Sequence, residues 1–443
     1  MRSPGCEPSP LTCLTLSPYA IMLTLDKTQL FGHIVEQHVN DAAFLWLQRS
    51  LAVKHAHHTA ASIAKLDTRV QKHLNGLMLS PRQAWDCALE AAEFREGGEV
   101  FVLAIQALAS GDKQKIQVAL DIAIDNPDTL KGFISALGWL PKETVYPWLQ
   151  PWITSSHSIE RYLSVSACSV RRLDPQTYLT ALLKDNNHLQ SITLYARALR
   201  LIGELKRRDL APVLAEAQAH EHPDVVFWAC WSSLLLGDRS VLHRLEPYVL
   251  NPGPMQTRAI EIAFRCLTPT QAWAWLNQLN NAPDQTSQTA LALAHLGDPQ
   301  GVNWLLARME EPRYTKVAGD AFCMITGADL EREGLTRHQA DLDQPSSEDV
   351  DDDEIPALDG YENLPVPDPS RVSQYWQNVR HQFNSSQNYF LGQPLGQPFD
   401  PNFLQNTVSH GRQSQRLTLA LTHALLDAKA GYANMKAPLY NAT

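Results

Sequence analysis

The chain has 443 residues and a formal net charge of -10, from 37 basic and 47 acidic side chains. This length exceeds one compact core and fits two or three domains or one elongated array. Apolar residues make up 44% of the chain, which excludes a protein that is disordered throughout. The negative charge argues against a nucleic-acid-binding protein, because such proteins usually carry a basic excess.

The first 21 residues are rich in Pro and Ser and contain Arg2 as their only basic residue. A secretory signal requires a basic start and an uninterrupted apolar stretch, so this segment does not fit one. We interpret residues 1–21 either as a disordered leader or as a segment that is not translated, in which case the true start codon is that of Met22. No apolar run reaches the ~20 residues that cross a bilayer, so no membrane partner is expected.

Seven cysteines are scattered along the chain without any Cys-x-x-Cys pair. This pattern indicates reduced thiols and a cytoplasmic protein, rather than a disulfide framework or a zinc site. Several of them stand inside apolar helical patterns, where a small hydrophobic side chain packs well.

Helical periodicity dominates the chain, with Ala, Leu, Gln and Glu recurring at 3.6-residue spacing. Helix starts are marked by a polar cap residue followed by Pro, since the cap oxygen accepts a free backbone N–H and Pro has none to leave unpaired. These starts are Ser80-Pro81, Asp174-Pro175, Thr268-Pro269, Asp298-Pro299 and Asp400-Pro401.

A two-helix unit recurs between Glu99 and Gly327. The first helix of each unit is predicted to end at a Gly or Leu residue, and these residues are about 27 to 35 positions apart, which is the range of two-helix repeats. Such a pair cannot bury its own apolar face, so successive pairs must stack into one continuous core. These residues are Gly111, Gly138, Leu173, Gly203, Gly237, Leu267, Gly297 and Gly327.

These observations predict an all-α protein, a HEAT-like helical-repeat solenoid of about eight units with the last incomplete. Residues 22–98 are expected to form a helical N-terminal cap, and residues 99–335 the repeats. A small C-terminal helical module is predicted over residues 371–443. We expect the second helix of each unit to build the curved inner face.

Between the repeats and the module, residues 336–370 are predicted to form an acidic, Pro-rich linker. Residues 341–370 contain 11 acids and no Lys or Arg, which leaves 36 acids against 37 bases elsewhere. Three aspartates here, Asp349, Asp351 and Asp353, resemble the start of a calcium loop. The positions where such a loop needs Gly and a bidentate Glu hold other residues, so a solvated linker is expected.

Nucleotide-binding and catalytic patterns are absent from the sequence: there is no P-loop, dinucleotide fingerprint, nucleophile elbow or His-Glu-x-x-His helix. We therefore expect a protein without enzymatic activity, cofactor or bound metal. His55, His57 and His58 offer imidazoles to a metal, but on a helix they do not converge well, and a solvated helix end is the preferred interpretation.

Two kinds of side chain are candidates for binding a partner. Basic residues cluster in neighbouring repeats, where they form an electropositive stripe for an acidic partner or for the protein's own acidic linker. The alternative is that they offset the dipoles of helix C-termini. Of two neighbouring Trp residues that cannot point the same way, one is expected to be partly exposed. The candidates are Arg197, Arg200, Arg207, Arg208, Trp273 and Trp275.

Motifs near both ends of the chain resemble a proteobacterial HEAT-repeat family of uncharacterised function, often encoded near type VI secretion effector genes. The resemblance covers roughly residues 25–443, with Asn75 and Asn388 departing from the pattern. The N-terminal motifs are Ala42-Ala43-Phe44-Leu45-Trp46 with Arg49, Leu66-Asp67-x-Arg69, and His73-Leu74-Asn75-Gly76-Leu77; the C-terminal ones are Trp376, Tyr389-Phe390-Leu391-Gly392-Gln393-Pro394 and Gly411-x-x-x-Gln415-Arg416.

The family has no assigned catalytic residues, so the resemblance implies none. Asp67 and Arg69 are expected to pair with other helices of the cap. Gly76 is expected to permit a tight helix exit. Gly392 and Pro394 are expected to shape the loop that packs the C-terminal module.

We therefore expect a cytoplasmic scaffold or adaptor that binds a protein partner on its concave face. The resemblance implies that this partner is a type VI secretion effector or spike component. One alternative is an immunity protein that neutralises a co-encoded toxin. Another is a helical-repeat lyase or glycosylase, which would require a deep pocket with an ionisable residue of displaced pKa. Nucleic acid is not the expected partner.

Overall fold

The computed structural model describes residues 32–184, 191–337, 359–427 and 429–439. The predicted leader and the calcium-like aspartates Asp349, Asp351 and Asp353 lie outside the described residues. So does most of the acidic linker.

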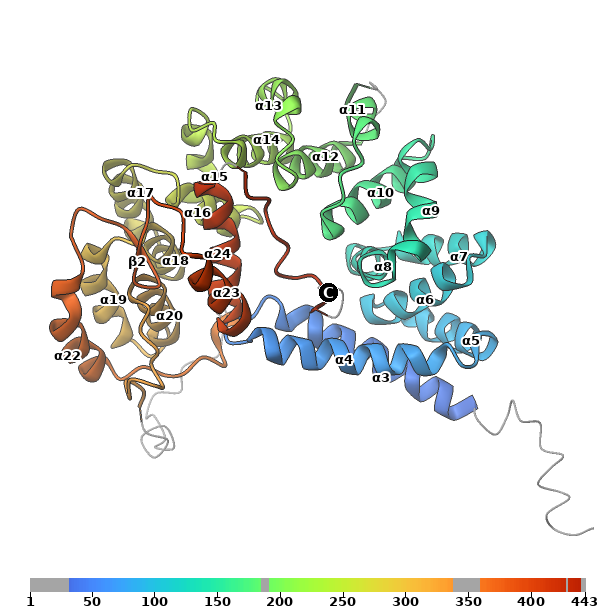
Figure 1. The fold of residues 1–443 in the computed structure, drawn as a ribbon, viewed down its shortest axis with the longest axis horizontal. Helices are drawn as coiled ribbons and strands as arrows, with labels where there is room; N and C mark the ends of the chain where they lie inside the picture. Colours follow the sequence, from blue (N-terminus) through green and yellow to red (C-terminus); the bar gives the residue numbers. More distant parts are fainter. Residues whose placement is uncertain (1–31, 185–190, 338–358, 428, 440–443) are drawn as a thin grey trace, which may run out of the picture.

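The described chain is an all-α helical-repeat solenoid, as predicted (Figure 1). Three helices form the N-terminal cap: α3 (Gly32–Ala52), α4 (Ala60–Leu77) and α5 (Pro81–Ala91). The first helices of the repeats are α6 (Gly97–Ser110), α8 (Pro127–Trp139), α10 (Ser158–Arg171), α12 (Ile192–Glu204), α14 (Pro223–Leu236), α16 (Gln256–Phe264), α18 (Thr286–Leu296) and α20 (Thr315–Thr326). The second helices are α7 (Lys113–Ala123), α9 (Lys142–Ile153), α11 (Thr177–Lys184), α13 (Ala211–Ala217), α15 (Glu246–Leu250), α17 (Pro269–Asn281) and α19 (Val302–Met309).

The C-terminal module contains three helices and one small hairpin. The helices are α22 (Pro369–Val379), α23 (Pro401–His410) and α24 (Gln413–Leu426), and the antiparallel strands are β1 (Tyr389–Phe390) and β2 (Gln393–Pro394). Short 3-10 turns complete the chain: η1 (Ala92–Phe94), η3 (Arg208–Leu210), η4 (Leu242–Leu245), η5 (Pro299–Gly301), η6 (Asp359–Tyr361) and η7 (Arg380–Gln382).

The predicted caps explain where several helices begin. The Asp298 carboxylate accepts the Gln300 amide at 2.9 Å, and the Asp400 carboxylate accepts the Asn402 amide at 2.8 Å. Each bond satisfies a backbone N–H that has no partner within its helix. Ser80 precedes α5 as predicted but makes no side-chain cap bond, so Pro81 is the effective signal there.

The inner face of the solenoid is built from the first helices, which corrects our expectation that the second helices form it (Figure 1). Helices α8, α10, α12 and α14 line the interior, while α9, α11 and α13 lie outside. The physical reason is the extent of burial. In α6 an almost continuous run from Gly97 to Leu108 is buried, because each first helix packs against its neighbours on both sides and against its own second helix.

The solenoid curves into an arc whose open side is spanned by the cap helices α3 and α4, with α24 and the C-terminal tail in the interior (Figure 1). The loop before α4 reaches the module directly: the Gln413 amide donates to the His58 carbonyl oxygen at 2.6 Å. The Arg412 guanidinium in turn lies 3.5 Å from the Glu331 carboxylate, close to the end of the repeats. The first and last parts of the chain are thus held together.

The β-hairpin attaches the module to the ends of two inner helices. The Tyr389 amide donates to the Gly297 carbonyl oxygen and the Leu391 amide to the Met324 carbonyl oxygen, both at 2.7 Å. Gly297 has a φ of +73°, and a Cβ there would lie 2.0 Å from the Tyr389 carbonyl oxygen. Gly297 therefore ends α18 in the left-handed conformation and also leaves room for the hairpin.

Gly76 has a different role from the predicted helix exit. It lies within α4, which continues to Leu77. A Cβ at position 76 would lie 2.9 Å from the His38 ring of α3. The glycine therefore leaves room for the His38 ring between the two cap helices, and a larger residue would have to displace that ring.

Candidate functional site

A buried carboxylate at the end of α12 organises charged residues on the inner face. The side chain of Glu204 is 0% exposed and lies 2.8 Å from Arg200 Nε and 3.2 Å from Arg172 Nη1. The Ser169 hydroxyl donates a further hydrogen bond to Glu204. The pKa of Glu204 falls to about 2, because the attraction of Arg200, Arg172 and Arg197 outweighs burial, which alone would raise it.

Several arginines lie near the single carboxylate of Glu204, and not all of them form an ion pair with it. Arg197 donates from Nε to the Ser166 hydroxyl at 3.3 Å but has no ion pair within the described residues. Arg258 likewise has no ion pair in the described chain, and its guanidinium lies 5.4 Å from the Trp228 ring centroid. Burial, with repulsion from Arg200, lowers the pKa of Arg197 to about 10 and also lowers that of Arg258. Arg258 is also attracted by the carboxylate of Glu261 in α16, so four arginines of the inner face are set against two carboxylates and a net positive charge remains.

Two of these arginines, Arg197 and Arg200, line a pocket of about 410 Å³ between α8, α10, α12 and α14. Arg200 lies over one wall, with its guanidinium 4.7 Å from the Trp228 ring centroid. We call this site the basic pocket; its polar and aromatic lining includes Lys131, Tyr162, Arg197, Arg200, Trp228 and one acidic residue, Asp224. An aromatic wall beside guanidinium groups suits a ligand that combines negative charge with apolar surface.

The predicted binding residues Arg197 and Arg200 both line the basic pocket. The other two basic candidates do not, because Arg207 and Arg208 lie in the loop after α12. Arg207 is bound to the Asp174 carboxylate at 2.8 Å and the Asp209 carboxylate at 2.7 Å, and so links two neighbouring repeats. The predicted stripe is thus divided between the pocket and a loop.

The two predicted Trp residues, Trp273 and Trp275, point to different sides of their helix, as their spacing of two positions required. Trp273 is half-buried and donates from Nε1 to the Asp298 carboxylate at 2.9 Å. Trp275 is 7% exposed and packs edge-to-face on Phe264, so its ring is part of the core and offers no surface to a partner. Both belong to α17, a second helix, and neither lies on the inner face.

Sequence reasoning placed Arg172 in the basic cluster and noted Trp228, but it missed Glu204 and Arg258 and did not predict that these four residues lie beside Arg197 and Arg200. Glu204 follows Arg200 by four positions on one helix, a spacing that places the two side chains together and could have signalled the pair. Arg172, Trp228 and Arg258 belong to three other inner helices or their ends. Nothing in their local sequence indicates that they meet α12.

A second, more enclosed site lies between the inner helices α16, α18, α20 and the module helix α24. This polar chamber has a volume of about 400 Å³, and its lining includes Glu261, Gln288, His295, Asp320 and Tyr361. Burial raises the pKa of Asp320 to about 6, raises that of Glu261 and lowers that of His295. Gln288 Oε1 and His295 Nδ1 are buried without a hydrogen-bond partner. The chamber thus gathers hydrogen-bond acceptors that the protein leaves unpaired.

Asp320→Asn is expected to stabilise the protein at neutral pH. Asp320 is 6% exposed, and its folded-state pKa near 6 lies above the ordinary value of 3.8, so its ionised form costs stability increasingly as pH rises through about 6. The variant should raise the free energy of unfolding by about 1–3 kcal/mol at pH 7.5, and by roughly 2 kcal/mol less at pH 4.5. Urea unfolding at both pH values measures this. The exposed Asp86→Asn is the control, and a gain that is the same at both pH values would contradict the assignment.

The histidine candidates for a metal lie close together in the loop before α4. The rings of His57 and His58 are 4.1 Å apart, and burial together with the neighbouring histidines lowers the pKa of His57 to about 4. Over the residues that the structure describes, no group of three or more His, Cys, Asp or Glu side chains is arranged to hold a metal ion. The five cysteines within that part of the chain are free thiols.

Comparisons with family models, with curated proteins and with solved structures found no match for this chain. Within its described ranges, no helix is both long enough and apolar enough to cross a membrane.

Proposed function

We propose that the protein is a non-enzymatic scaffold or adaptor that binds an acidic segment of a protein partner in the basic pocket. The observation that supports this most is the charge of the inner face. Arg172, Arg197, Arg200 and Arg258 gather around Glu204, and two of them lack an ion pair in the described chain. A carboxylate from a partner would supply the missing negative charge.

The shape of the site favours a protein ligand over a nucleic acid. Phosphate backbones are bound by basic residues distributed along an extended exposed track. Here Arg197 and Arg200 line one pocket, and the side chains of Arg172 and Arg200 are partly covered, at 20% and 26% exposed. Concave solenoid surfaces typically receive protein segments. On the basis of the resemblance described above, we further propose that the partner is a type VI secretion effector or spike component.

The first test measures capture of a type VI secretion effector, the class of partner that the resemblance implies. Arg197→Gln with Arg258→Gln removes one guanidinium from the lining of the basic pocket and one beside Trp228, and it leaves the ion pairs of Glu204 with Arg172 and Arg200 in place. The double variant should reduce capture at least tenfold, about 1.4 kcal/mol, and wild-type capture should weaken as salt rises from low to high ionic strength. A matched double variant on exposed sites, Arg313→Gln with Arg332→Gln, should capture as the wild type does. Equal capture by all three proteins would rule out the basic pocket.

The immunity alternative differs in its effect on growth. Cytosolic expression of the effector with and without this protein separates the two functions. Rescue of growth would indicate immunity, whereas unchanged toxicity with lost secretion would indicate an adaptor. The inner-face double variant tests in either case whether the basic pocket is the contact.

One observation favours a second function, a helical-repeat lyase or glycosylase. The polar chamber is enclosed and holds Asp320, an ionisable residue of raised pKa. A glycosylase would release free base from alkylated DNA, and Asp320→Asn would abolish the release while the fold persists. Absence of release by the wild type would leave the adaptor proposal in place.

A further inference from the structure

The C-terminal tail, residues 429–439, crosses the inner face as an irregular segment without α-helix or strand (Figure 1). It leaves α24, passes α14 and α10, and ends beside the cap helices α3 and α4. The tail therefore lies against parts of the chain that are up to 387 residues away in sequence. Its contacts with those parts resemble those of a bound peptide.

The first half of the tail is held at the ends of two inner helices. Arg172 donates from Nε to the Tyr432 carbonyl oxygen at 2.6 Å, and its guanidinium lies 5.3 Å from the Tyr432 ring centroid. The Tyr432 ring also packs edge-to-face on Trp231, with centroids 5.6 Å apart. Asn434 donates from Nδ2 to the Val170 carbonyl oxygen at 2.8 Å. Tyr432 is thus an aromatic anchor between α10 and α14.

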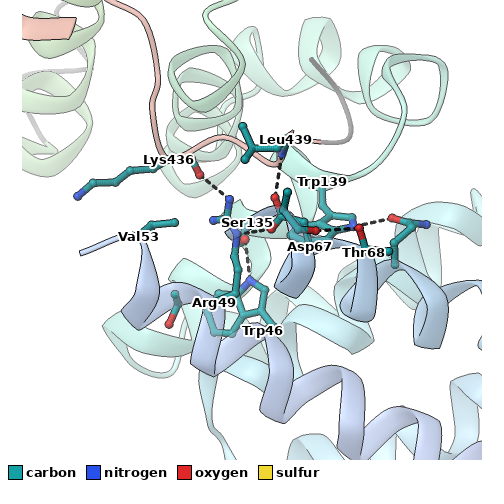
Figure 2. A network of polar contacts seen from close by, with 12 residues as sticks. Trp46, Arg49, Val53, Asp67, Thr68, Ser135, Trp139, Lys436 and Leu439 are labelled. Carbon is teal, nitrogen blue, oxygen red and sulfur yellow. Dashed lines mark hydrogen bonds and ion pairs between the residues drawn. The ribbon is translucent and has the colours of Figure 1, made fainter. Parts of the chain in front are cut away.

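The second half of the tail is held by a buried ion pair of the cap (Figure 2). Arg49 Nε lies 2.8 Å from the Asp67 carboxylate, and the two side chains are 7% and 1% exposed. The remaining atoms of this pair bind the tail: Arg49 Nη2 donates to the Lys436 carbonyl oxygen, and Asp67 Oδ2 accepts the Leu439 amide, both at 2.8 Å. The Leu439 side chain packs on a small apolar cluster of Ala52, Val53 and Ile63.

Most of this recognition is directed at main-chain atoms. Gln413 Nε2 donates to the Met435 carbonyl oxygen at 3.1 Å, so four of the five hydrogen bonds described here engage the backbone of the tail. Backbone groups are the same in every sequence, so the specificity must come from side chains: the Asn434 amide and above all the two anchors, Tyr432 and Leu439, which are seven residues apart. The residues of the body that make these contacts, here named the tail track, are Arg49, Asp67, Val170, Arg172, Trp231 and Gln413.

We propose that the tail track is a peptide-binding surface and that the C-terminal tail is its exchangeable intramolecular ligand. The partner that the track fits is an extended protein segment with an aromatic residue followed, seven positions later, by an aliphatic one. Such a segment takes the place of Tyr432 and Leu439 and receives the same main-chain hydrogen bonds. Because the tail is attached, its high effective concentration keeps the track occupied until a competing segment arrives.

The test uses the full chain, folded with its own tail. A site-specific protease sequence is inserted after Ala428, and cleavage then leaves the tail held by its contacts alone. A fluorescein-labelled synthetic peptide of residues 429–443 is added, and fluorescence anisotropy follows its binding. We expect saturable binding to the cleaved protein and at least tenfold weaker binding to the uncleaved protein, in which the attached tail competes.

Variants of the labelled peptide show which side chains the tail track recognises. Tyr432→Ala and Leu439→Ala should each weaken binding at least tenfold, whereas Lys429→Ala, at an exposed position outside the contacts, should bind as the unchanged peptide does. The proposal is overturned if the labelled peptide fails to exchange into the cleaved protein, or if it binds cleaved and uncleaved protein equally. Neither result depends on the basic pocket, so the adaptor proposal stands or falls separately.

Discussion

Glu204→Gln is expected to lower the free energy of unfolding by about 3–5 kcal/mol, because it leaves a cluster of buried guanidinium groups without their shared negative charge. Arg200 and Arg172 lose their ion pairs with this carboxylate. Gln has almost the same shape as Glu, so the loss reports charge rather than packing. Chemical unfolding followed by circular dichroism measures it.

The pH dependence provides an independent check. The folded-state pKa of Glu204, about 2, lies below the ordinary value of 4.5, so its contribution is complete above pH 4.5 and disappears as pH falls through about 2. The stability of the wild type should therefore decline more steeply over this window than that of Glu204→Gln. The control is Asp209→Asn, whose exposed carboxylate pairs with Arg207 in the same region and should cost less than about 1 kcal/mol. A loss for Glu204→Gln no larger than that of the control would contradict the described network.

Asp67→Asn is expected to have an effect of similar size, about 3–5 kcal/mol, because it leaves the buried Arg49 guanidinium unpaired. The variant should also loosen the tail, since Asp67 accepts the Leu439 amide. Hydrogen exchange measured by mass spectrometry should therefore show faster exchange for residues 429–439 than in the wild type. A loss of stability without faster hydrogen exchange in residues 429–439 would contradict the described bond between Asp67 and the tail.

A double variant distinguishes the missing charge from the missing shape. Arg49→Met with Asp67→Leu replaces the buried pair by apolar side chains and should recover much of the stability lost in Asp67→Asn, because no unpaired charge remains buried. It should not restore protection of the tail, which needs the polar atoms of both side chains. The exposed pair of Lys131 and Asp128 offers a control, since Asp128→Asn should have little effect on either measurement.

The repeat architecture could be predicted from local signals alone. Gly111, Gly237, Gly297 and Gly327 each follow the last residue of an inner helix in the left-handed conformation, which the chain marks with a recurring glycine. The choice of inner and outer face could not be predicted in this way. Both helices of a pair carry apolar residues, and the more complete burial of the first helix arises only when successive pairs stack.

The candidate site was only partly predictable for a similar reason. Arg197 and Arg200 are close in sequence and share one helix face, so their cooperation was foreseeable. Asp67 was expected to pair within the cap, and its bond to Arg49 agrees with that expectation. Its second bond, to Leu439, spans 372 residues and has no local signal. The gathering of Arg172, Trp228 and Arg258 likewise arises only when successive repeats stack.

The closure of the arc changes how the whole chain should behave as a folding unit. In an open repeat array each unit interacts with its immediate neighbours, so the ends can fray independently. Here the cap, the inner helix α10 and the module all bind the same segment, residues 429–439, through Arg49, Arg172 and Gln413 respectively. Loss of order in the cap therefore removes contacts of residues 429–439, and loss of order in those residues removes contacts of the cap, α10 and α14, so we expect these parts to unfold together.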